Sequence, residues 1–214
     1  MEIIYHFLII DDHPMIINGY KTIIQSKFPD AIFHEASNID DAISLSNSVK
    51  NIDFLLLDYN IGKPSNDIEN GIDLAKYLAS KYTSLKTLII TAHEEIAIVY
   101  NIHKKVRPNA LLIKSDVNAE ELLFAIDNTL KGEIYRSNKA QQALISMNQR
   151  TILLQEDNIQ ILMLLDKGYK VQEIPSLIHK SLSSVQRNIV LLKEVFNVSE
   201  NNGLLREAKR QGFI

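Results

Sequence analysis

The sequence predicts an α/β domain with an open parallel (βα)5 sheet, followed by a small domain made only of helices. Two observations support this prediction. Over residues 1–131, short apolar runs alternate five times with longer segments whose apolar residues recur at helical spacing. From residue 151 onward, only the helical spacing is found. Three of the five short runs are apolar almost throughout, which is typical of strands covered by helices on both faces and therefore of a parallel sheet.

The (βα)5 pattern places strands at residues 5–10, 31–35, 53–58, 85–91 and 110–114. The helices that follow these strands are expected at residues 14–27, 40–49, 70–81, 94–104 and 119–130. Pro14 falls in the first turn of the first helix, where proline is tolerated because the N–H that it lacks has no helical partner there. Asn118 or Asp116 can cap the last helix with a side-chain oxygen.

The alternation stops after residue 131 and divides the chain into three parts. Residues 1–131 form the α/β domain, residues 132–150 are polar with no clear period and are predicted to be a linker, and residues 151–214 form the helical domain. In that domain, helices are expected at residues 157–166, 171–178, 182–196 and 202–209. The break at residues 179–181 separates a short helix from a longer one, which is typical of a helix-turn-helix motif.

The composition indicates a globular protein and excludes several function classes. Of the 214 residues, 46% are hydrophobic and 23% are charged, which is sufficient for a buried core. The absence of cysteine excludes disulfides, thiolate metal sites and a cysteine nucleophile. No run approaches the ~20 apolar residues of a membrane span, and the first apolar run ends at Asp11 and Asp12, unlike a signal peptide. We therefore expect a cytoplasmic protein that does not bind a membrane.

Charge is divided unevenly along the chain. Residues 1–149 contain 14 Lys and Arg against 19 Asp and Glu, whereas residues 150–214 contain 9 against 7. An acidic first part joined to a weakly basic second part is consistent with a regulatory domain attached to a nucleic-acid binder, although an excess of this size also arises by chance.

Polar side chains stand at the carboxyl ends of four of the five expected strands. Asp11 and Asp12 close the first strand, Asp58 the third, Thr91 the fourth and Lys114 the fifth. Ligands of open parallel sheets bind at this edge, and three carboxylates are tolerated there when a hard divalent cation such as Mg²⁺ joins them. Asp58 is then the candidate nucleophile for a phosphoryl group. Thr91 and Lys114 offer a hydroxyl and an ammonium group to the phosphoryl oxygens.

The segments 9–14, 56–58, 89–92 and 112–116 at these strand ends resemble the receiver domain of two-component response regulators, which has a flavodoxin-like fold. The resemblance covers the whole of residues 1–131. It implies transfer of a phosphoryl group from a phosphohistidine of a partner histidine kinase to Asp58. It also implies Mg²⁺ bound by Asp12, Asp58 and the backbone carbonyl of Asn60, with Asp11 contributing through water.

Two features depart from the receiver pattern. The glycine that usually follows the phosphorylated aspartate comes later than usual, at Gly71, so an insertion is expected within residues 62–70. An insertion beside the site is expected to alter kinase access or the rate of dephosphorylation. The position three residues before Lys114, usually Tyr or Phe, is Leu111, so the usual aromatic switch is missing. Signal output is then expected to depend on Thr91 and the helix after it, or to be weak.

The second domain also follows a known pattern. Leu154, Gly168, Ser181 and Val198 stand in a register that resembles the four-helix DNA-binding domain of the LuxR/FixJ/NarL class of regulators. Gly168 is expected to end the first helix in the left-handed conformation, and Ser181 to cap the recognition helix. The residues that helical spacing assigns to the core are Ile174, Ile178, Val185, Ile189 and Leu192.

The opposite face of the recognition helix is predicted to bind DNA. Gln and Arg side chains reach base edges in the major groove, whereas Ser and Lys more often contact phosphates. In the first helix, Gln155, Asp157 and Asn158 replace the Thr, Arg and Glu that are usual in this class. The candidate DNA-binding residues are Lys180, Ser181, Ser183, Ser184, Gln186, Arg187, Val190 and Lys193.

These observations predict a phosphorylation-controlled transcription factor and not an enzyme. Phosphorylation is expected to promote a homodimer on double-stranded promoter DNA, because one recognition helix reads only a few base pairs. Apolar helical surface for such a dimer is available at residues 96–102 and 122–126. Two alternatives stay open. The receiver domain is a phosphorylation-independent dimerisation module, as Leu111 permits, or the chain is an aspartyl-nucleophile phosphatase, although Asn60 stands where such enzymes need a second acid.

Overall fold

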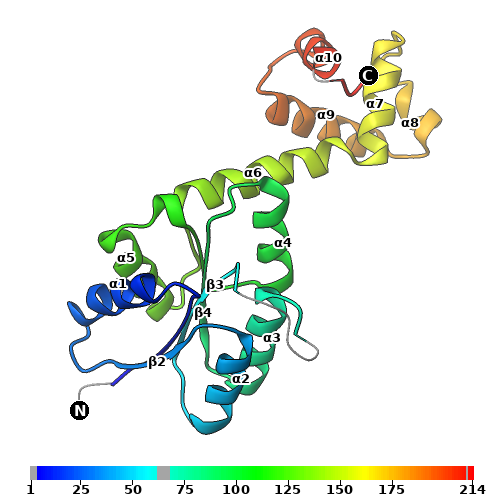
Figure 1. Cartoon of the computed structure of the whole chain (residues 1–214). Coiled ribbons are helices and arrows are strands. Elements are labelled where there is room, and N and C mark those ends of the chain that lie inside the picture. The colour runs from blue at the N-terminus through cyan, green and yellow to red at the C-terminus, as the bar shows by residue number, and fades with distance from the viewer. Residues whose placement is uncertain (1–3, 62–67, 211) are drawn as a thin grey trace. The chain divides into compact units, whose positions relative to one another are not determined.

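The computed structural model describes residues 4–61, 68–210 and 212–214. It separates into two compact units, Met1–Leu144 and Ile145–Ile214 (Figure 1). Each unit is described by itself below. Among the described residues, no helix is long and apolar enough to cross a membrane.

The first unit is built around a parallel sheet that has six strands among the described residues, in the order β2-β1-β3-β4-β5-β6. All neighbouring strands are parallel. The strands are β1 (His6–Ile10), β2 (Ile32–Ala36), β3 (Phe54–Asp58), β4 (Lys86–Thr91), β5 (Ala110–Ile113) and β6 (Tyr135–Arg136). The helices are α1 (Pro14–Gln25), α2 (Ile39–Ser48), α3 (Gly71–Lys81), α4 (Ile96–Val106) and α5 (Ala119–Leu130), and a short 3-10 turn, η1 (Lys114–Asp116), follows β5.

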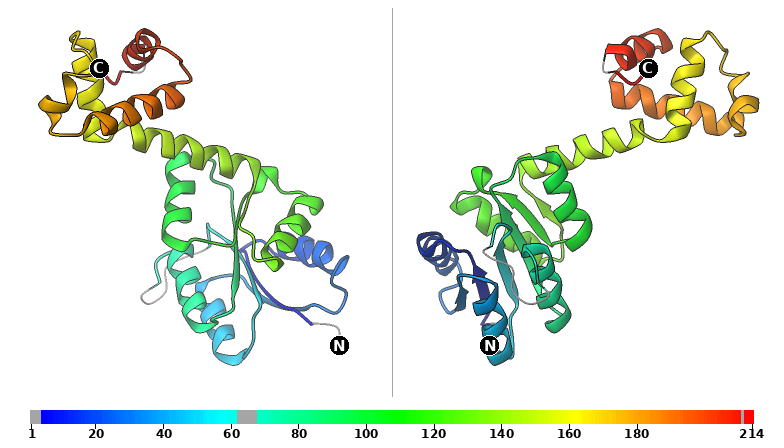
Figure 2. Two further views of the ribbon diagram at one scale, coloured as in Figure 1. Left: turned by 180° about the vertical axis from the view of Figure 1, so that it is seen from behind. Right: turned by 45° about the vertical axis from the view of Figure 1, so that its right-hand side comes forward.

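Helices cover both faces of this sheet (Figure 2), which explains why the inner strands β3 and β5 are almost wholly apolar. Alternate residues of one strand point to opposite faces. Phe7 and Ile9 pack with α1 and α5, whereas Leu8 and Ile10 pack with α2, α3 and α4. The predicted parallel α/β fold is therefore confirmed. Each predicted strand and helix of this unit is found within two residues of its expected bounds.

Residues 132–150, for which the sequence shows no period, correct the expectation of five strands. They contain β6 and most of α6 (Asn138–Leu153). The β6 strand pairs with β5 over only two residues, too few to give a periodic signal. In its first half, α6 buries the small side chains Ala140 and Ala143 between polar residues, so its apolar face is weak in the sequence.

The β6 segment closes the outer side of β5 with hydrogen bonds. Tyr135 N donates to Asn109 O at 2.8 Å, and Ser137 N donates to Leu111 O at 3.1 Å. The buried Ser137 hydroxyl in turn accepts from Ile113 N at 3.1 Å. The polar segment after α5 is therefore part of the sheet.

The second unit is helical, as predicted. After the end of α6, its described residues form α7 (Glu156–Asp166), α8 (Ile174–Ile178), α9 (Leu182–Phe196) and α10 (Asn201–Arg210). The five positions assigned to the core from helical spacing are all buried, and they pack with Ile161, Leu162 and Leu204. Gly168 follows α7 with a positive φ of 88°, the left-handed conformation expected of it. The Ser181 hydroxyl accepts from Ser184 N at 3.1 Å and caps α9, also as expected.

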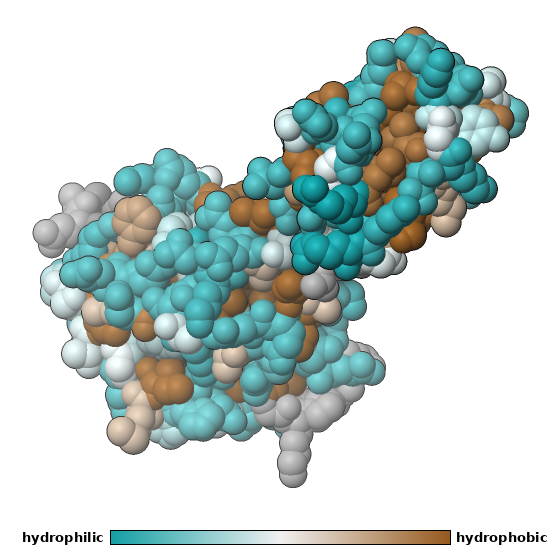
Figure 3. Space-filling model, turned by 90° about the horizontal axis from the view of Figure 1, so that it is seen from above, coloured by the Kyte–Doolittle hydropathy of each residue, from teal (hydrophilic) through white to brown (hydrophobic). Residues whose placement is uncertain are grey.

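Hydrophilic residues cover most of the surface seen in Figure 3, and hydrophobic residues are exposed in patches between them. On the first unit, the exposed large apolar side chains include Met15 of α1, Phe124 of α5 and Ile134 beside β6. The Phe124 ring also makes an edge contact with Tyr135, with the ring centroids 5.4 Å apart. Single exposed apolar residues such as Met15 are normal on a protein surface, and they do not by themselves indicate a binding face.

Candidate functional site

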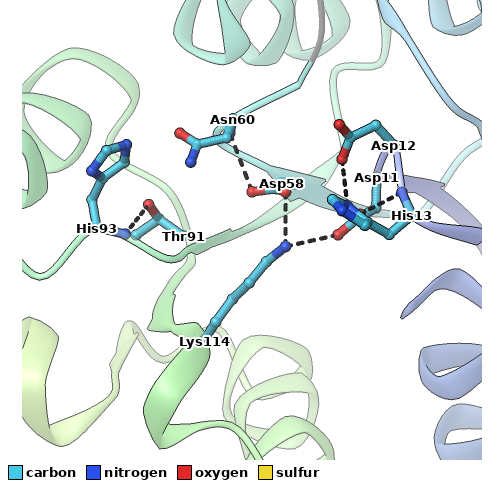
Figure 4. Close-up of polar contacts among 8 residues, drawn as sticks. All are labelled: Asp11, Asp12, His13, Asp58, Asn60, Thr91, His93 and Lys114. Carbon is cyan, nitrogen blue, oxygen red and sulfur yellow. Dashed lines mark hydrogen bonds and ion pairs between the residues drawn. The ribbon is translucent and has the colours of Figure 1, made fainter. Parts of the chain in front are cut away.

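The acidic and basic side chains predicted at the strand ends meet at one edge of the sheet (Figure 4). Asp11 follows β1, Asp58 is the last residue of β3, Thr91 is the last residue of β4 and Lys114 follows β5. Parallel strands end at the same edge, so the pairing of β1, β3, β4 and β5 is what brings these residues together.

Lys114 connects the two buried carboxylates of the site. Its Nζ donates to Asp58 Oδ2 at 2.8 Å and to Asp11 Oδ2 at 3.0 Å. The side chains of Asp11 and Asp58 are only 2% and 4% exposed, whereas that of Lys114 is 23% exposed. One ammonium group therefore faces two buried carboxylates, and the site carries an excess of negative charge that a second cation can neutralise.

Backbone amides fix the other oxygens of these carboxylates. Asp58 Oδ1 accepts from Asn60 N at 3.1 Å, and Asp11 Oδ1 accepts from His13 N at 2.9 Å. The chain directly after each strand thus turns back over its own carboxylate. This local turn holds both carboxylates in defined orientations before any ligand binds.

Asp12 and His13 form the exposed side of the site. Asp12 Oδ1 lies 2.7 Å from His13 Nδ1, and the two side chains are 46% and 66% exposed. Asp11, Asp12 and His13 offer ligand atoms that all lie within 4.8 Å of one another. His13 is not among the site residues predicted from the sequence, although it directly follows the acidic pair.

Burial and charge act in opposite directions on Lys114. Burial by itself lowers the pKa of its ammonium group, but the hydrogen bonds and negative charges of Asp58 and Asp11 outweigh burial and raise the pKa above the usual value. Lys114 therefore stays protonated throughout the neutral range. Nearby, burial raises the pKa of Tyr20 to about 12, so this phenol also stays protonated.

Thr91 is completely buried at the end of β4. Its Oγ1 accepts from His93 N at 3.0 Å and so joins the hydroxyl to the loop that precedes α4 (Figure 4). The O–H of a threonine that accepts such a bond is still available as a donor. Thr91 thus keeps a hydroxyl donor at the end of β4, the strand that pairs with β3.

Comparison with known proteins identifies the first unit. A family model described as response regulator receiver domain matches residues 7–127. The chain belongs to the response regulator receiver family. The family resemblance predicted from the strand ends is therefore confirmed, and receiver domains generally bind Mg²⁺ at their acidic site.

Relatives of this response regulator match it over nearly its whole length. The transcriptional regulatory protein ComA of Bacillus subtilis is 23% identical, over 97% of this chain and 98% of ComA. The response regulator protein VraR of Staphylococcus aureus is 24% identical, over 85% of each chain. These relatives are regulators, as the sequence predicted, and they give no support to the phosphatase alternative.

Solved structures of RcsB share the fold of the response regulator. RcsB of Salmonella typhimurium aligns with a TM-score of 0.62 at 18% identity, over 98% of this chain and all of that one. The RcsB–DNA complex aligns with a TM-score of 0.60 at 19% identity, over 97% of this chain and 98% of that one. A receiver followed by a helical domain is thus confirmed as the architecture of the response regulator.

The two departures from the receiver pattern have different outcomes. Leu111, at the usual aromatic position, is completely buried in β5 and packs in the core against α4. Of the insertion expected within residues 62–70, residues 62–67 lie outside the described residues. Gly71, at the start of α3, lies against the chain that follows Asp58, since a Cβ there would come within 2.7 Å of Tyr59 O.

The predicted DNA-binding residues of the response regulator lie on the accessible face of α9 or, for Lys180 and Ser181, directly before it. Among them, Gln186, Arg187 and Val190 are exposed, whereas Ser184 and Lys193 are half-buried. Lys180 is also exposed, but its Nζ lies 2.7 Å from Asp157 Oδ2. Asp157, which stands in α7 where an arginine is usual, thus neutralises the charge of Lys180, one of the residues predicted to contact DNA.

Proposed function

We propose that this response regulator is a DNA-binding transcription regulator that a histidine kinase controls by phosphorylating Asp58. The observation that carries the proposal is the placement of the Asp58 carboxylate, which is buried at the carboxyl end of the central strand β3 and bound to Lys114. Phosphorylation is expected to promote a homodimer that binds double-stranded promoter DNA.

The chemistry follows from the groups that surround Asp58. A carboxylate oxygen of Asp58 attacks the phosphorus of the kinase phosphohistidine, a P–O bond forms and the P–N bond breaks with its electron pair left on the imidazole. Lys114 gives a positive charge to one phosphoryl oxygen, and the Thr91 hydroxyl donates to another. The backbone N–H of Asn60 keeps the carboxylate oriented during the reaction.

Mg²⁺ is the cofactor that suits this site. Asp11, Asp12, Asp58 and the backbone carbonyl of Asn60 offer only oxygen ligands, which Mg²⁺ prefers. Two of the carboxylates are buried and share the single ammonium group of Lys114, so the site can accommodate more positive charge. When bound, Mg²⁺ would neutralise the carboxylates and the incoming phosphoryl oxygens.

Phosphorylation can be tested by intact mass after incubation with acetyl phosphate and Mg²⁺. The wild-type protein should gain the mass of one phosphoryl group, Asp58→Asn should gain none, and the control Asp30→Asn, at an exposed loop residue, should be labelled normally. Excess EDTA should prevent labelling, because three carboxylates would repel the phosphate without a cation. Equal labelling of Asp58→Asn would show that the site is elsewhere, and labelling in EDTA would exclude Mg²⁺.

DNA binding is proposed from the second unit. RcsB has been solved in complex with DNA and as two dimers bound to two parallel DNAs. In this chain, α9 is capped by Ser181 and exposes Gln186 and Arg187 within its first two turns, where a recognition helix contacts base edges. The proposed DNA contacts are Lys180, Ser181, Ser183, Ser184, Gln186, Arg187, Val190 and Lys193.

The role of Arg187 can be separated from that of a general phosphate contact. If Arg187 binds a base, Arg187→Ala should lower affinity by ~1 to 3 kcal/mol and relax the preference at one base position. If it binds a phosphate, all sequences should weaken alike and the salt slope should fall by about one unit. Lys167→Ala, at an exposed residue after α7, is the control. Unchanged specific binding by the double variant Gln186→Ala with Arg187→Ala would contradict this assignment.

One observation favours a second candidate function, in which the receiver dimerises without phosphorylation. Leu111 is aliphatic and fully packed, so β5 has no ring that can change its orientation. Sedimentation on a promoter fragment distinguishes the two functions. Phosphorylation control predicts that acetyl phosphate increases the dimer on DNA for the wild type but not for Asp58→Asn. Equal dimerisation of both proteins, with and without acetyl phosphate, supports the second function.

A further inference from the structure

Three side chains connect the loop after β4, the turn after β5 and the first turn of α6. Glu94 Oε1 accepts from Ser115 Oγ at 2.6 Å and from Lys139 Nζ at 2.6 Å. Lys139 Nζ also donates to Ser115 Oγ at 2.9 Å, which closes a triangle of hydrogen bonds. We call Glu94, Ser115 and Lys139 the latch.

Two members of the latch are close in sequence to residues that would bind the phosphoryl group. Ser115 directly follows Lys114, whose ammonium group is bound to Asp58. Glu94 belongs to the loop of residues 92–95, and Thr91, at the start of this loop, already bonds to the loop through His93 N. Ser115 and the loop that carries Glu94 therefore adjoin Lys114 and Thr91, the two residues proposed to bind the phosphoryl oxygens.

The third member, Lys139, lies on a helix that is firmly bound to the first unit at its start. Lys139 N donates to Asp116 Oδ2 at 2.8 Å, so the turn after β5 caps α6. Ala140 and Ala143 of α6 are buried in the core beside α4. The same helix continues to Leu153, beyond the division between the two units after Leu144.

The latch is suited to opening because it lies at the surface. The side chains of Lys139 and Glu94 are 42% and 52% exposed. The hydrogen bonds lower the pKa of Glu94 and raise that of Lys139, so both groups are charged at neutral pH. Exposed ion pairs contribute little to the stability of a fold, and the unit does not need this one in order to remain folded.

We propose that the latch is closed in the unphosphorylated protein and that phosphorylation of Asp58 opens it, which releases the first turn of α6. A phosphoryl group gives new acceptors to Thr91 Oγ1 and Lys114 Nζ, and both residues move toward it. The loop that carries Glu94 and the turn that carries Ser115 then leave Lys139. This inference rests on the proposed function. It assigns to the latch the coupling between the phosphorylation site and α6, because the buried Leu111 has no ring that could rotate to provide it.

The first part of the test needs no phosphorylation. Amide hydrogen exchange is measured by mass spectrometry on peptides that contain residues 92–95 and 138–143. Lys139→Met should raise exchange in both segments about two- to fivefold, as expected for the loss of an exposed ion pair. The control Lys76→Met, at an exposed lysine of α3, should leave both segments unchanged. Exchanging the charges, with Glu94→Lys and Lys139→Glu together, should restore part of the protection.

The second part repeats the exchange after acetyl phosphate and Mg²⁺, with intact mass measured on the same samples. The labelled wild type should show increased exchange at residues 138–143, whereas Lys139→Met should be labelled equally and show no further increase. Wild-type exchange by Lys139→Met before labelling would overturn the latch. A labelled wild type with unchanged exchange at 138–143 would overturn the coupling alone. A wild type that takes no label would contradict the proposed function and the coupling with it.

Discussion

Replacing Lys114 by methionine is expected to destabilise the first unit strongly. The variant keeps the length of the side chain but leaves Asp11 and Asp58, which are 2% and 4% exposed, without the ammonium group that binds both of them. Removing one partner from a buried ion pair costs about 3 to 5 kcal/mol of unfolding free energy. For a unit of this size, such a loss lowers Tm by roughly 6 to 20 °C.

The pH of the measurement follows from the sign of the pKa change. Because the pKa of Lys114 is raised in the fold, its contribution is fully present below the ordinary lysine value of about 10.4 and is lost only when the pH rises through the folded value. A measurement at neutral pH, in EDTA so that no metal replaces the lost charge, therefore captures the whole effect.

Hydrogen exchange of peptides from β1 and β3 reports the opening free energy of the first unit alone, and thermal unfolding gives Tm. Lys76→Met is the control for removal of a lysine charge. The double variant Asp58→Asn with Lys114→Met should regain much of the loss, because only one buried carboxylate then lacks its partner. If Lys114→Met lowers the unfolding free energy by less than about 1 kcal/mol and the double variant is no more stable than the single one, Lys114 does not balance the two buried carboxylates.

Three further predictions follow from contacts described above. In chemical denaturation, Gly71→Ala should lower the free energy of unfolding by about 1 to 3 kcal/mol, because the added Cβ meets a backbone oxygen. Gly19→Ala, in the open interior of α1, should raise it by about 0.5 to 1 kcal/mol. Equal effects of the two substitutions would contradict the crowding at the start of α3. Asp157→Asn should release Lys180 and increase DNA affinity, and the fall of log K with log salt concentration should become steeper by about one unit in binding titrations. An unchanged salt slope would show that Lys180 does not contact DNA. Burial, together with nearby arginines, lowers the pKa of His103, so the folded state takes up fewer protons than the unfolded state and stability falls as the pH drops below about 6.5. His103→Gln should lessen that fall in unfolding experiments, and an equally steep fall would exclude His103 as its source.

Strand and helix positions were predictable where burial is continuous. The β3 strand, Phe54–Asp58, is apolar up to its last residue, and both its bounds and its terminal carboxylate follow from that pattern. The convergence of Asp11, Asp58 and Lys114 was predictable as well, because parallel strands end at one edge of a sheet.

Other features depend on contacts between distant segments and have no local signal. The β6 strand exists only because β5 provides its hydrogen-bond partners, and α6 is capped by Asp116 from another part of the chain. The pairing of Lys180 with Asp157 likewise joins the loop before α9 to α7, and neither residue alone indicates it. Tertiary contacts of this kind are not encoded in the periodicity of one segment.

The hydrogen bonds between β6 and β5 also bear on how the protein avoids aggregation. The β5 strand is short, fully buried and entirely apolar, with the sequence Ala-Leu-Leu-Ile. An uncovered strand of this kind offers free backbone groups and apolar side chains to other copies, and such edges are sites of intermolecular β pairing. A fragment that ends at residue 131 lacks the covering segment and is expected to self-associate through β5. A fragment that continues through Leu144 keeps this edge closed. The polar segment that connects the two domains therefore also protects the first domain from intermolecular pairing through β5.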